Sequence, residues 1–458
     1  MKPFLTSFPS VNTPIFVCVC ACVIGSLFAS HHSFSQHLAP TSNPTSNTIL
    51  TPEYVLELAL SSPVFLNESS AKLKMAEGEL ESARRWWMPV TTFGATRFAH
   101  NGNALNANGD IFTDVDARSA ELGIGLYFNA DAGRGFTGVE TAKISQKATI
   151  QHIKAERDAF VLSCMNLFIS AVSATKEHAD FLTASTELSE IEKQFETLAG
   201  LGLRPYSDAL MIKSERLYLE SQTLLFQSTL ESVLAELRGA LGLPVTVGIQ
   251  TVWPSIEETL GVSVASNSLS GAFLLANPPA RQAIQYRMEE AESEKNGLSR
   301  EVWLPELRFS PMLSGFGSDF ASTSLASTTE WVASAVFSFP LENIIPGGKR
   351  KQADAKIDLA NAKLAEWDLR HSAYVDGLVL RISTVEKSLE AAVASAQAAD
   401  SAMSDVLLRS SHGIVDPVEL LQIHSRRLQA HSYSISLKDI LLKLQFELIS
   451  ETNPSWTK

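Results

Sequence analysis

Two very long stretches of helix-forming residues dominate the pattern of polar and apolar positions along the chain. Neither stretch contains a proline, and only Gly138 interrupts the first (Gly135 to Ala199) and only Gly377 the second (349–410). An α-helix rises about 1.5 Å per residue, so a helix of about 65 residues is roughly 100 Å long. Because such a helix cannot fold back inside an ordinary globular core, the pattern predicts coiled-coil-like packing against neighbouring helices.

A shorter helix and a pair of strands precede each long helix. Residues 53–87 and 271–302 are rich in Ala, Glu, Leu and Lys at helical spacing, and a proline ends each run. Segments of β-type residues with glycine interruptions follow, and they predict barrel strands within residues 90–128 and 306–340. A tight turn and a second helix complete each half. The sequence thus predicts a mainly α-helical chain with four β-strands.

The two halves of the chain are two copies of one unit. Residues 86–89 (Trp-Trp-Met-Pro) match residues 302–305 (Val-Trp-Leu-Pro), and Gly133-Arg134 matches Gly348-Lys349-Arg350, in the same order. The predicted organisation is a first structural repeat at 51–243, an inter-repeat linker or equatorial region at 244–270, a second structural repeat at 271–451 and a C-terminal tail at 452–458.

The N-terminal segment has the pattern of a signal peptide. Residues 14–29 (PIFVCVCACVIGSLFA) form a mostly apolar run without a charged side chain. Its length is typical of a signal-peptide core, so we predict a signal peptide at 1–35 and a disordered linker at 36–50. A short membrane anchor, or lipid attachment at Cys22, stays open as an alternative.

Composition argues against catalysis and against a nucleic-acid partner. The chain has 37 basic and 50 acidic residues, a formal charge of −13, and no basic stripe that could bind phosphates. No histidine pair has the spacing and acidic neighbour of a zinc-binding helix, and Cys164 is the one cysteine beyond the predicted leader. No Ser-His-Asp or Cys-His motif stands out. We therefore expect a protein that is not an enzyme and that uses no metal or cofactor.

The number of predicted strands limits how the chain could cross a membrane. No stretch after the leader approaches 18 uncharged apolar residues, so we expect the chain to be soluble or to cross a membrane as strands. Four strands cannot close a barrel, because an outer-membrane barrel needs at least eight and an open edge leaves unpaired amides in lipid. Either several subunits share one barrel, or there is no barrel.

The duplicated plan, with its Trp-Leu-Pro entry and Gly-Gly-Lys-Arg exit, resembles the TolC family of outer-membrane efflux proteins over about residues 51–451. The resemblance implies a homotrimer whose protomers share one twelve-stranded β-barrel, which continues into an α-helical coiled-coil tunnel in the periplasm. It implies a passive exit duct in the outer membrane for tripartite efflux or type I secretion. The implied partners are outer-membrane lipid, a periplasmic adaptor and, through that adaptor, an inner-membrane pump. The alternative is a periplasmic or secreted coiled-coil scaffold without a membrane barrel.

The resemblance also assigns roles to the two turns between the long helices. The implied adaptor-docking tips contain Gly200, Gly202, Pro205, Asp208, Gly413 and Pro417. Glu419 matches the carboxylate of the family's periplasmic aperture, where a threefold ring of acids would favour cations. The family's second acid is replaced here by Gln422. Asp416, one helical turn before Glu419, supplies either compensating charge or a cap for the turn.

One further motif has the form of a nucleotide-binding fingerprint. Residues 133–138 satisfy G-x-G-x-x-G, but the helix that follows is several times too long for a βαβ unit. The matching residues 346–350 lack the pattern. We interpret both segments as the junction between barrel and tunnel, where glycines permit a sharp change of backbone direction. The predicted junction residues are Gly133, Arg134, Gly347, Gly348, Lys349 and Arg350.

Overall fold

The computed structural model describes residues 49–105, 108–243, 248–249, 253–255, 277–304, 306–317, 326–336, 348–411 and 415–452. Several predictions fall outside these residues. They are the signal peptide, most of the N-terminal linker and of the inter-repeat region, residues 337–340 of the last strand, residues 453–458, Gly347 and Gly413.

Most of the described chain is helical, as the sequence predicts. The helices are α2 (Pro52–Leu60), α3 (Pro63–Arg84), α4 (Ala132–Gly200), α5 (Tyr206–Leu241), α8 (Pro279–Trp303), α10 (Gly348–Ser411) and α11 (Pro417–Thr452). The two long ones, α4 and α10, contain 69 and 64 residues. The predicted single helix at 53–87 is instead α2 and α3. Helix α2 ends at Leu60 and Pro63 begins α3, because proline lacks the N–H needed to continue a helix.

Four antiparallel strands form one sheet in the order β2-β3-β5-β6. Their bounds are β2 (Val90–Leu105), β3 (Ile111–Asp131), β5 (Glu306–Gly317) and β6 (Ala326–Val336). Pairing of β3 with β5 joins the two halves of the chain, for example at Ile124 and Leu313. The strands approach closely at Gly125, where a Cβ would lie 2.7 Å from the carbonyl oxygen of Pro311. A separate short parallel pair joins β1 (Ile49–Leu50) to β4 (Gly248–Ile249).

The two faces of this sheet differ sharply in polarity, because side chains alternate along each strand. The register places the following residues on one face: Phe93 and Ala95 of β2, Leu122, Ile124, Leu126 and Phe128 of β3, and Leu307, Phe309, Pro311 and Leu313 of β5. Most of these apolar side chains are exposed by 42% or more, and Phe93 reaches 76%. The opposite face is mostly polar or small, with Thr92, Glu121, Asn129, Arg308 and Ser310 among its residues.

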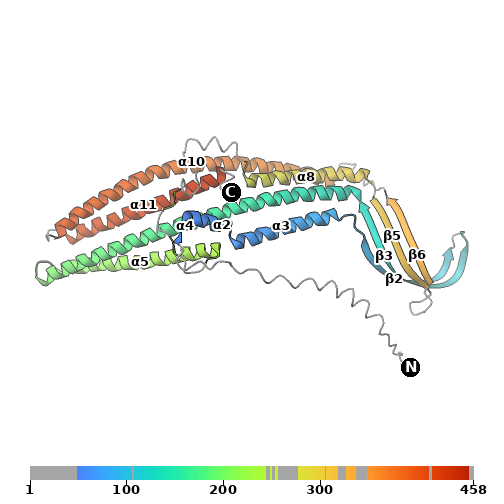
Figure 1. The fold of residues 1–458 in the computed structure, drawn as a ribbon, viewed down its shortest axis with the longest axis horizontal. Coiled ribbons are helices and arrows are strands. Elements are labelled where there is room, and N and C mark those ends of the chain that lie inside the picture. Colours follow the sequence, from blue (N-terminus) through green and yellow to red (C-terminus); the bar gives the residue numbers. More distant parts are fainter. Residues whose placement is uncertain are drawn as a thin grey trace, which may run out of the picture. The chain divides into compact units, whose positions relative to one another are not determined.

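The helices pack as two antiparallel hairpins, α4 with α5 and α10 with α11, and α11 also contacts α4 (Figure 1). Val161, Met165 and Phe168 of α4 are fully buried in an apolar core to which α2, α5 and α11 contribute. The expectation that no stretch is long and apolar enough to cross a membrane is wrong for α4, which passes that test by length and composition. Its apolar residues are explained by this core, which they help to fill.

Candidate functional site

The first turn between long helices, residues 201–205, closes with a Schellman motif. The amide of Gly202 donates to the carbonyl of Ala199 at 3.0 Å, and the amide of Leu203 donates to Leu198 at 2.9 Å. Gly202 has φ +70°, the left-handed conformation that this motif requires and that glycine adopts without strain. Pro205 then starts α5 from an extended conformation. The backbone conformation of this turn therefore explains why the predicted tip residue 202 is a glycine.

Arg204 ties this turn to the second one. Its Nη2 donates a hydrogen bond of 2.6 Å to the carbonyl oxygen of Val415, and its guanidinium carbon lies 5.4 Å from the ring centroid of Phe195. Its Nη1 is also 3.6 Å from Oδ2 of Asp208, and both of these side chains are mostly buried. The predicted tip residue Asp208 thus helps to hold an arginine that bridges the two helical hairpins.

The second turn is described from Val415 onward. Asp416 caps α11: its Oδ1 accepts from the amide of Val418 at 3.1 Å, and its carbonyl accepts from Leu420 at 3.1 Å. Pro417 occupies the first helical position, where a missing N–H costs nothing. Of the two roles that the sequence left open for Asp416, the geometry supplies the cap. Val415 is buried in a second apolar cluster, together with Leu188 of α4 and Ile212 of α5, so apolar packing reaches this turn.

Glu419 lies in the first turn of α11 and forms an ion pair inside its own chain. Nη2 of Arg409, near the end of α10, donates to Oε1 of Glu419 at 2.8 Å, while Nε of Arg409 donates to Asp405 at 2.9 Å. The Glu419 side chain is 42% exposed, so the pair is solvated and contributes little to folding. Its consequence is electrostatic, because a fixed cation partly neutralises the carboxylate predicted for the aperture.

Gln422 lies one turn further along α11 and is exposed. It lines an open groove between α11 and α5, opposite Met211 and Glu215. The structure therefore places Gln422 and Glu419 near one another on the first two turns of α11, with an amide where the family pattern has a second carboxylate.

At the predicted junction, glycines permit close packing between segments. Gly133 and Gly135 are absent from the described residues with positive φ, and β3 passes directly into α4. A Cβ on Gly133 would lie 2.8 Å from Cα of Glu301, and one on Gly135 would lie 2.1 Å from the ring of Trp86. These two glycines therefore let α4 approach α8 and the segment after α3, a role that the sequence did not predict.

The predicted basic residues of the junction fall into two environments. Nε of Arg134 lies 3.4 Å from Oδ2 of Asp131 and 3.3 Å from Oε1 of Glu301, so it links the start of α4 to α8. Gly348, Lys349 and Arg350 are exposed in the first turn of α10. Arg134 and Lys349 line the same groove between α4, α8 and α10.

Sequence reasoning missed the two arginines that organise the tips. Arg204 has an acid four residues later, and Arg409 lies ten residues before Glu419 across a tight turn, so both spacings were available as signals. Neither spacing reveals that Arg204 reaches a backbone carbonyl of the other hairpin. Within the described ranges, no group of three or more His, Cys, Asp or Glu side chains could hold a metal ion.

Known proteins resemble this chain in fold and not in sequence. No known family model matches the sequence, and no curated protein matches it. Solved structures do match. The outer-membrane channel OprN aligns with TM-score 0.70 and 16% identity over 89% of this chain and 91% of that chain. The Campylobacter jejuni CmeC outer membrane channel aligns with TM-score 0.70 and 15% identity over 92% and 93%. The outer membrane protein VceC of Vibrio cholerae aligns with TM-score 0.68 and 15% identity over 88% and 95%.

These alignments cover nearly the whole of each protein, so the chain has the fold of an outer-membrane channel. The resemblance predicted from the duplicated sequence is thus confirmed at the level of fold.

Proposed function

We propose that this chain is the outer-membrane exit duct of a Gram-negative export system. Three copies would close their sheets into one twelve-stranded barrel in the outer membrane and continue as a helical tunnel in the periplasm. The duct would conduct its cargo passively, for tripartite efflux or type I secretion. The likeness to outer-membrane channels supports this proposal, and the main evidence for it is the four-stranded sheet described above.

The observation that supports the proposal most strongly is the apolar face of the sheet. On β3 alone it presents Leu122, Ile124 and Leu126, each between 42% and 47% exposed, and Phe93 on β2 is 76% exposed. Contiguous exposed apolar surface of this kind is rare on soluble proteins and marks a lipid or protein contact. Alternation of apolar and polar side chains along each strand is the pattern of a membrane β-barrel with a polar interior.

The sheet edges explain why more than one copy is needed. Strands β2 and β6 lie at the two ends of the strand order, and among the described strands each pairs on one side only. An unpaired edge in lipid leaves amide and carbonyl groups without hydrogen bonds, at several kcal/mol per group. Pairing β6 of one copy with β2 of the next would remove every edge, which supports a closed ring of identical chains.

The helical tips would face the periplasmic partners. In this proposal the two turns, tied by Arg204, form the surface on which an adaptor docks, and the adaptor connects the duct to an inner-membrane pump. Glu419 and Gln422 would line the aperture beside this surface, and the Asp416 cap would fix where α11 begins. Arg134, Lys349 and Arg350 would lie where barrel and tunnel meet.

A pair of lysine substitutions on neighbouring residues of β3 tests the proposal. Leu122→Lys places a charge on the apolar face, and Glu121→Lys places the same charge on the polar face. A lysine on the lipid face costs roughly 2–4 kcal/mol at the bilayer midplane and less near its surfaces. We expect the wild type and Glu121→Lys to fractionate with the outer membrane as a trimer that survives unboiled electrophoresis. Leu122→Lys should assemble poorly.

Two outcomes would contradict the proposal. If the wild-type chain is recovered as a soluble monomer, the duct proposal is wrong and the protein is better explained as a coiled-coil scaffold. Equal assembly of both lysine variants would show that the apolar face does not contact lipid. Native mass spectrometry of the extracted protein gives the number of subunits independently of the gel.

A further inference from the structure

A partly buried ionic cluster joins the two helical hairpins where α11 meets α4. Nη1 of Arg427 on α11 donates to Oε2 of Glu187 on α4 at 2.8 Å, and Nε donates to Oδ1 of Asp400 on α10 at 2.8 Å. One guanidinium group thus ties three helices together. We call this α11–α4 contact around Arg427 the seam.

His424 lies one helical turn before Arg427 and faces the same seam. Its side chain is 2% exposed, and among the described residues its Nε2 has no hydrogen-bond partner. The nearest acid, Oε2 of Glu187, is 3.8 Å away, too far for a hydrogen bond. Burying a ring nitrogen without a partner is costly, so this position requires an explanation.

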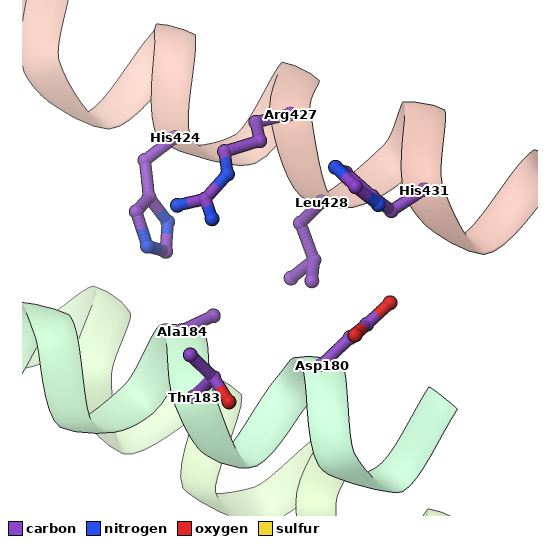
Figure 2. A pocket seen from close by; sticks show the side chains of 7 residues that line it. All are labelled: Asp180, Thr183, Ala184, His424, Arg427, Leu428 and His431. Carbon is purple, nitrogen blue, oxygen red and sulfur yellow. The ribbon is translucent and has the colours of Figure 1, made fainter. Parts of the chain in front are cut away.

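The ring borders a small polar cavity between α11 and α4. The cavity has a volume of about 80 Å³ and is lined by Asp180, Thr183 and Ala184 of α4 and by His424, Arg427, Leu428 and His431 of α11. Figure 2 shows the two histidines and Arg427 on one helix facing Asp180, Thr183 and Ala184 on the other. A polar space of this size can admit water, which gives a proton a path to the ring.

The charged groups around His424 come from three helices. Glu187 lies closest to it on α4, and Asp180 of α4 lines the same cavity, whereas Arg427 and His431 lie on α11 itself and bind Asp400 of α10. Asp400 is occupied by Arg427 and by Nε2 of His431, which lies 3.0 Å from its Oδ2. Glu187 is therefore the acid closest to His424, and it is already bound to Arg427.

We propose that the seam is a proton-sensitive contact, in which protonation of Nε2 of His424 draws Glu187 away from Arg427 and loosens α11 from α4. A protonated ring would place a buried cation beside the partly exposed Arg427, and both would compete for the same carboxylate. Loosening would free the α10–α11 hairpin, with Asp416 and Glu419 at its tip, to move relative to α4. The inference concerns one chain and does not depend on the proposed duct.

The direction of the effect follows from linkage. Burial lowers the pKa of His424 below its ordinary value of 6.5, and the neighbouring Arg427 acts in the same direction, whereas Glu187 and a backbone hydrogen bond at Ala184 oppose it. The ring is thus neutral in the closed seam and regains its ordinary pKa when water reaches it. The seam is fully stabilised above pH 6.5 and weakens as the pH falls below that value.

Hydrogen–deuterium exchange of the full chain at pH 7.5 and pH 5.5 tests this proposal. Exchange rates of α11 amides around residues 420–432 are divided by the intrinsic rates at each pH, which gives protection factors. We expect wild-type protection there to fall severalfold at pH 5.5. His424→Gln and His424→Leu, which cannot be protonated in this range, should show no such fall. His152→Gln, at an exposed histidine paired with Glu156 on its own helix, should behave like the wild type.

Two results would overturn the proposal. Equal wild-type protection at both pH values would show that the seam does not respond to protons. A fall that persists in both His424 variants would assign the response to Asp180, Glu187, Asp400 or His431 instead. Using two replacements, one polar and one apolar, separates loss of titration from a general change in packing.

Discussion

The guanidinium of Arg204 and the carbonyl oxygen of Val415 are joined by a hydrogen bond of 2.6 Å, although 211 residues separate them in the chain. The donor lies in the α4–α5 turn, and the acceptor lies just before α11. This bond therefore links the ends of two helical hairpins that the sequence presents as separate copies of one unit. The link is asymmetric, because the arginine belongs to one copy only.

Replacing Arg204 should loosen the second turn more than the first. A hydrogen bond from a charged donor contributes roughly 1.5–3 kcal/mol, and leaving the buried Val415 region without it exposes the start of α11 to water. We expect Arg204→Met to raise hydrogen exchange at Leu420 and its neighbours, while the Schellman bonds of Gly202 persist. Arg426→Met, at an exposed arginine of α11, is the matched control. Unchanged exchange in Arg204→Met would show that the bond does not stabilise this turn.

A second prediction concerns the charge of the proposed aperture. Arg409 neutralises part of the Glu419 carboxylate, so Arg409→Gln should strengthen cation block of the channel and Glu419→Gln should weaken it. Glu419→Ala should also raise leak. Conductance of the purified protein in planar bilayers, measured across calcium concentrations, gives the midpoint of block for each variant.

The pair of variants tests position as well as charge. Both substitutions remove one member of the same ion pair, and a solvated pair contributes little to folding, so any difference in block reflects the field at the aperture. If both variants shift the midpoint in the same direction, or if neither shifts it, Glu419 does not line the conduction path. The fold assignment is independent of that result.

The sequence predicts the large elements of this fold because long, uninterrupted periodicity is a strong local signal. For that reason the sequence predicts the long helix α4 and the strands around Ile124. The junction glycines are harder to interpret from local sequence. Gly135 packs against the ring of Trp86, and this contact between residues far apart in the chain leaves no local signal. Likewise, the charge of Glu419 is visible in the sequence, whereas its pairing with Arg409 depends on how the turn brings α10 and α11 together.

The packing role assigned to the junction glycines gives a third prediction. Gly135→Ala places a Cβ 2.1 Å from the ring of Trp86, so the ring and its neighbours must shift, at a cost of roughly 1–3 kcal/mol. Gly138 lies on the same helix, and a Cβ at that position would meet no atom within 4 Å, so Gly138→Ala should stabilise α4 by about 1 kcal/mol. Thermal unfolding of the two variants should therefore shift in opposite directions. Equal shifts would remove the packing explanation.

Acid should weaken the contact between α8 and α10 through Asp368. Nε and Nη2 of Arg281 donate to its two oxygens at 2.7 and 3.1 Å, and this pairing lowers the pKa of Asp368 below 3.8. A lowered pKa means that the stabilisation is complete above pH 3.8 and is lost as the pH falls through the lower value in the folded chain. The Asp368 side chain is 44% exposed, so solvent screening keeps the effect small.

The measurement is hydrogen exchange at the start of α8, from pH 5 down to pH 2.5, corrected for intrinsic rates. Wild-type protection should fall steadily below pH 3.8, whereas Asp368→Asn should have lower protection at pH 5 and lose little more on acidification. Asp358→Asn, also on α10, is the matched control and should follow the wild type. Because a protonated carboxyl still accepts a hydrogen bond, a variant that matches the wild type throughout would show that Arg281 is held by contacts other than its charge pair.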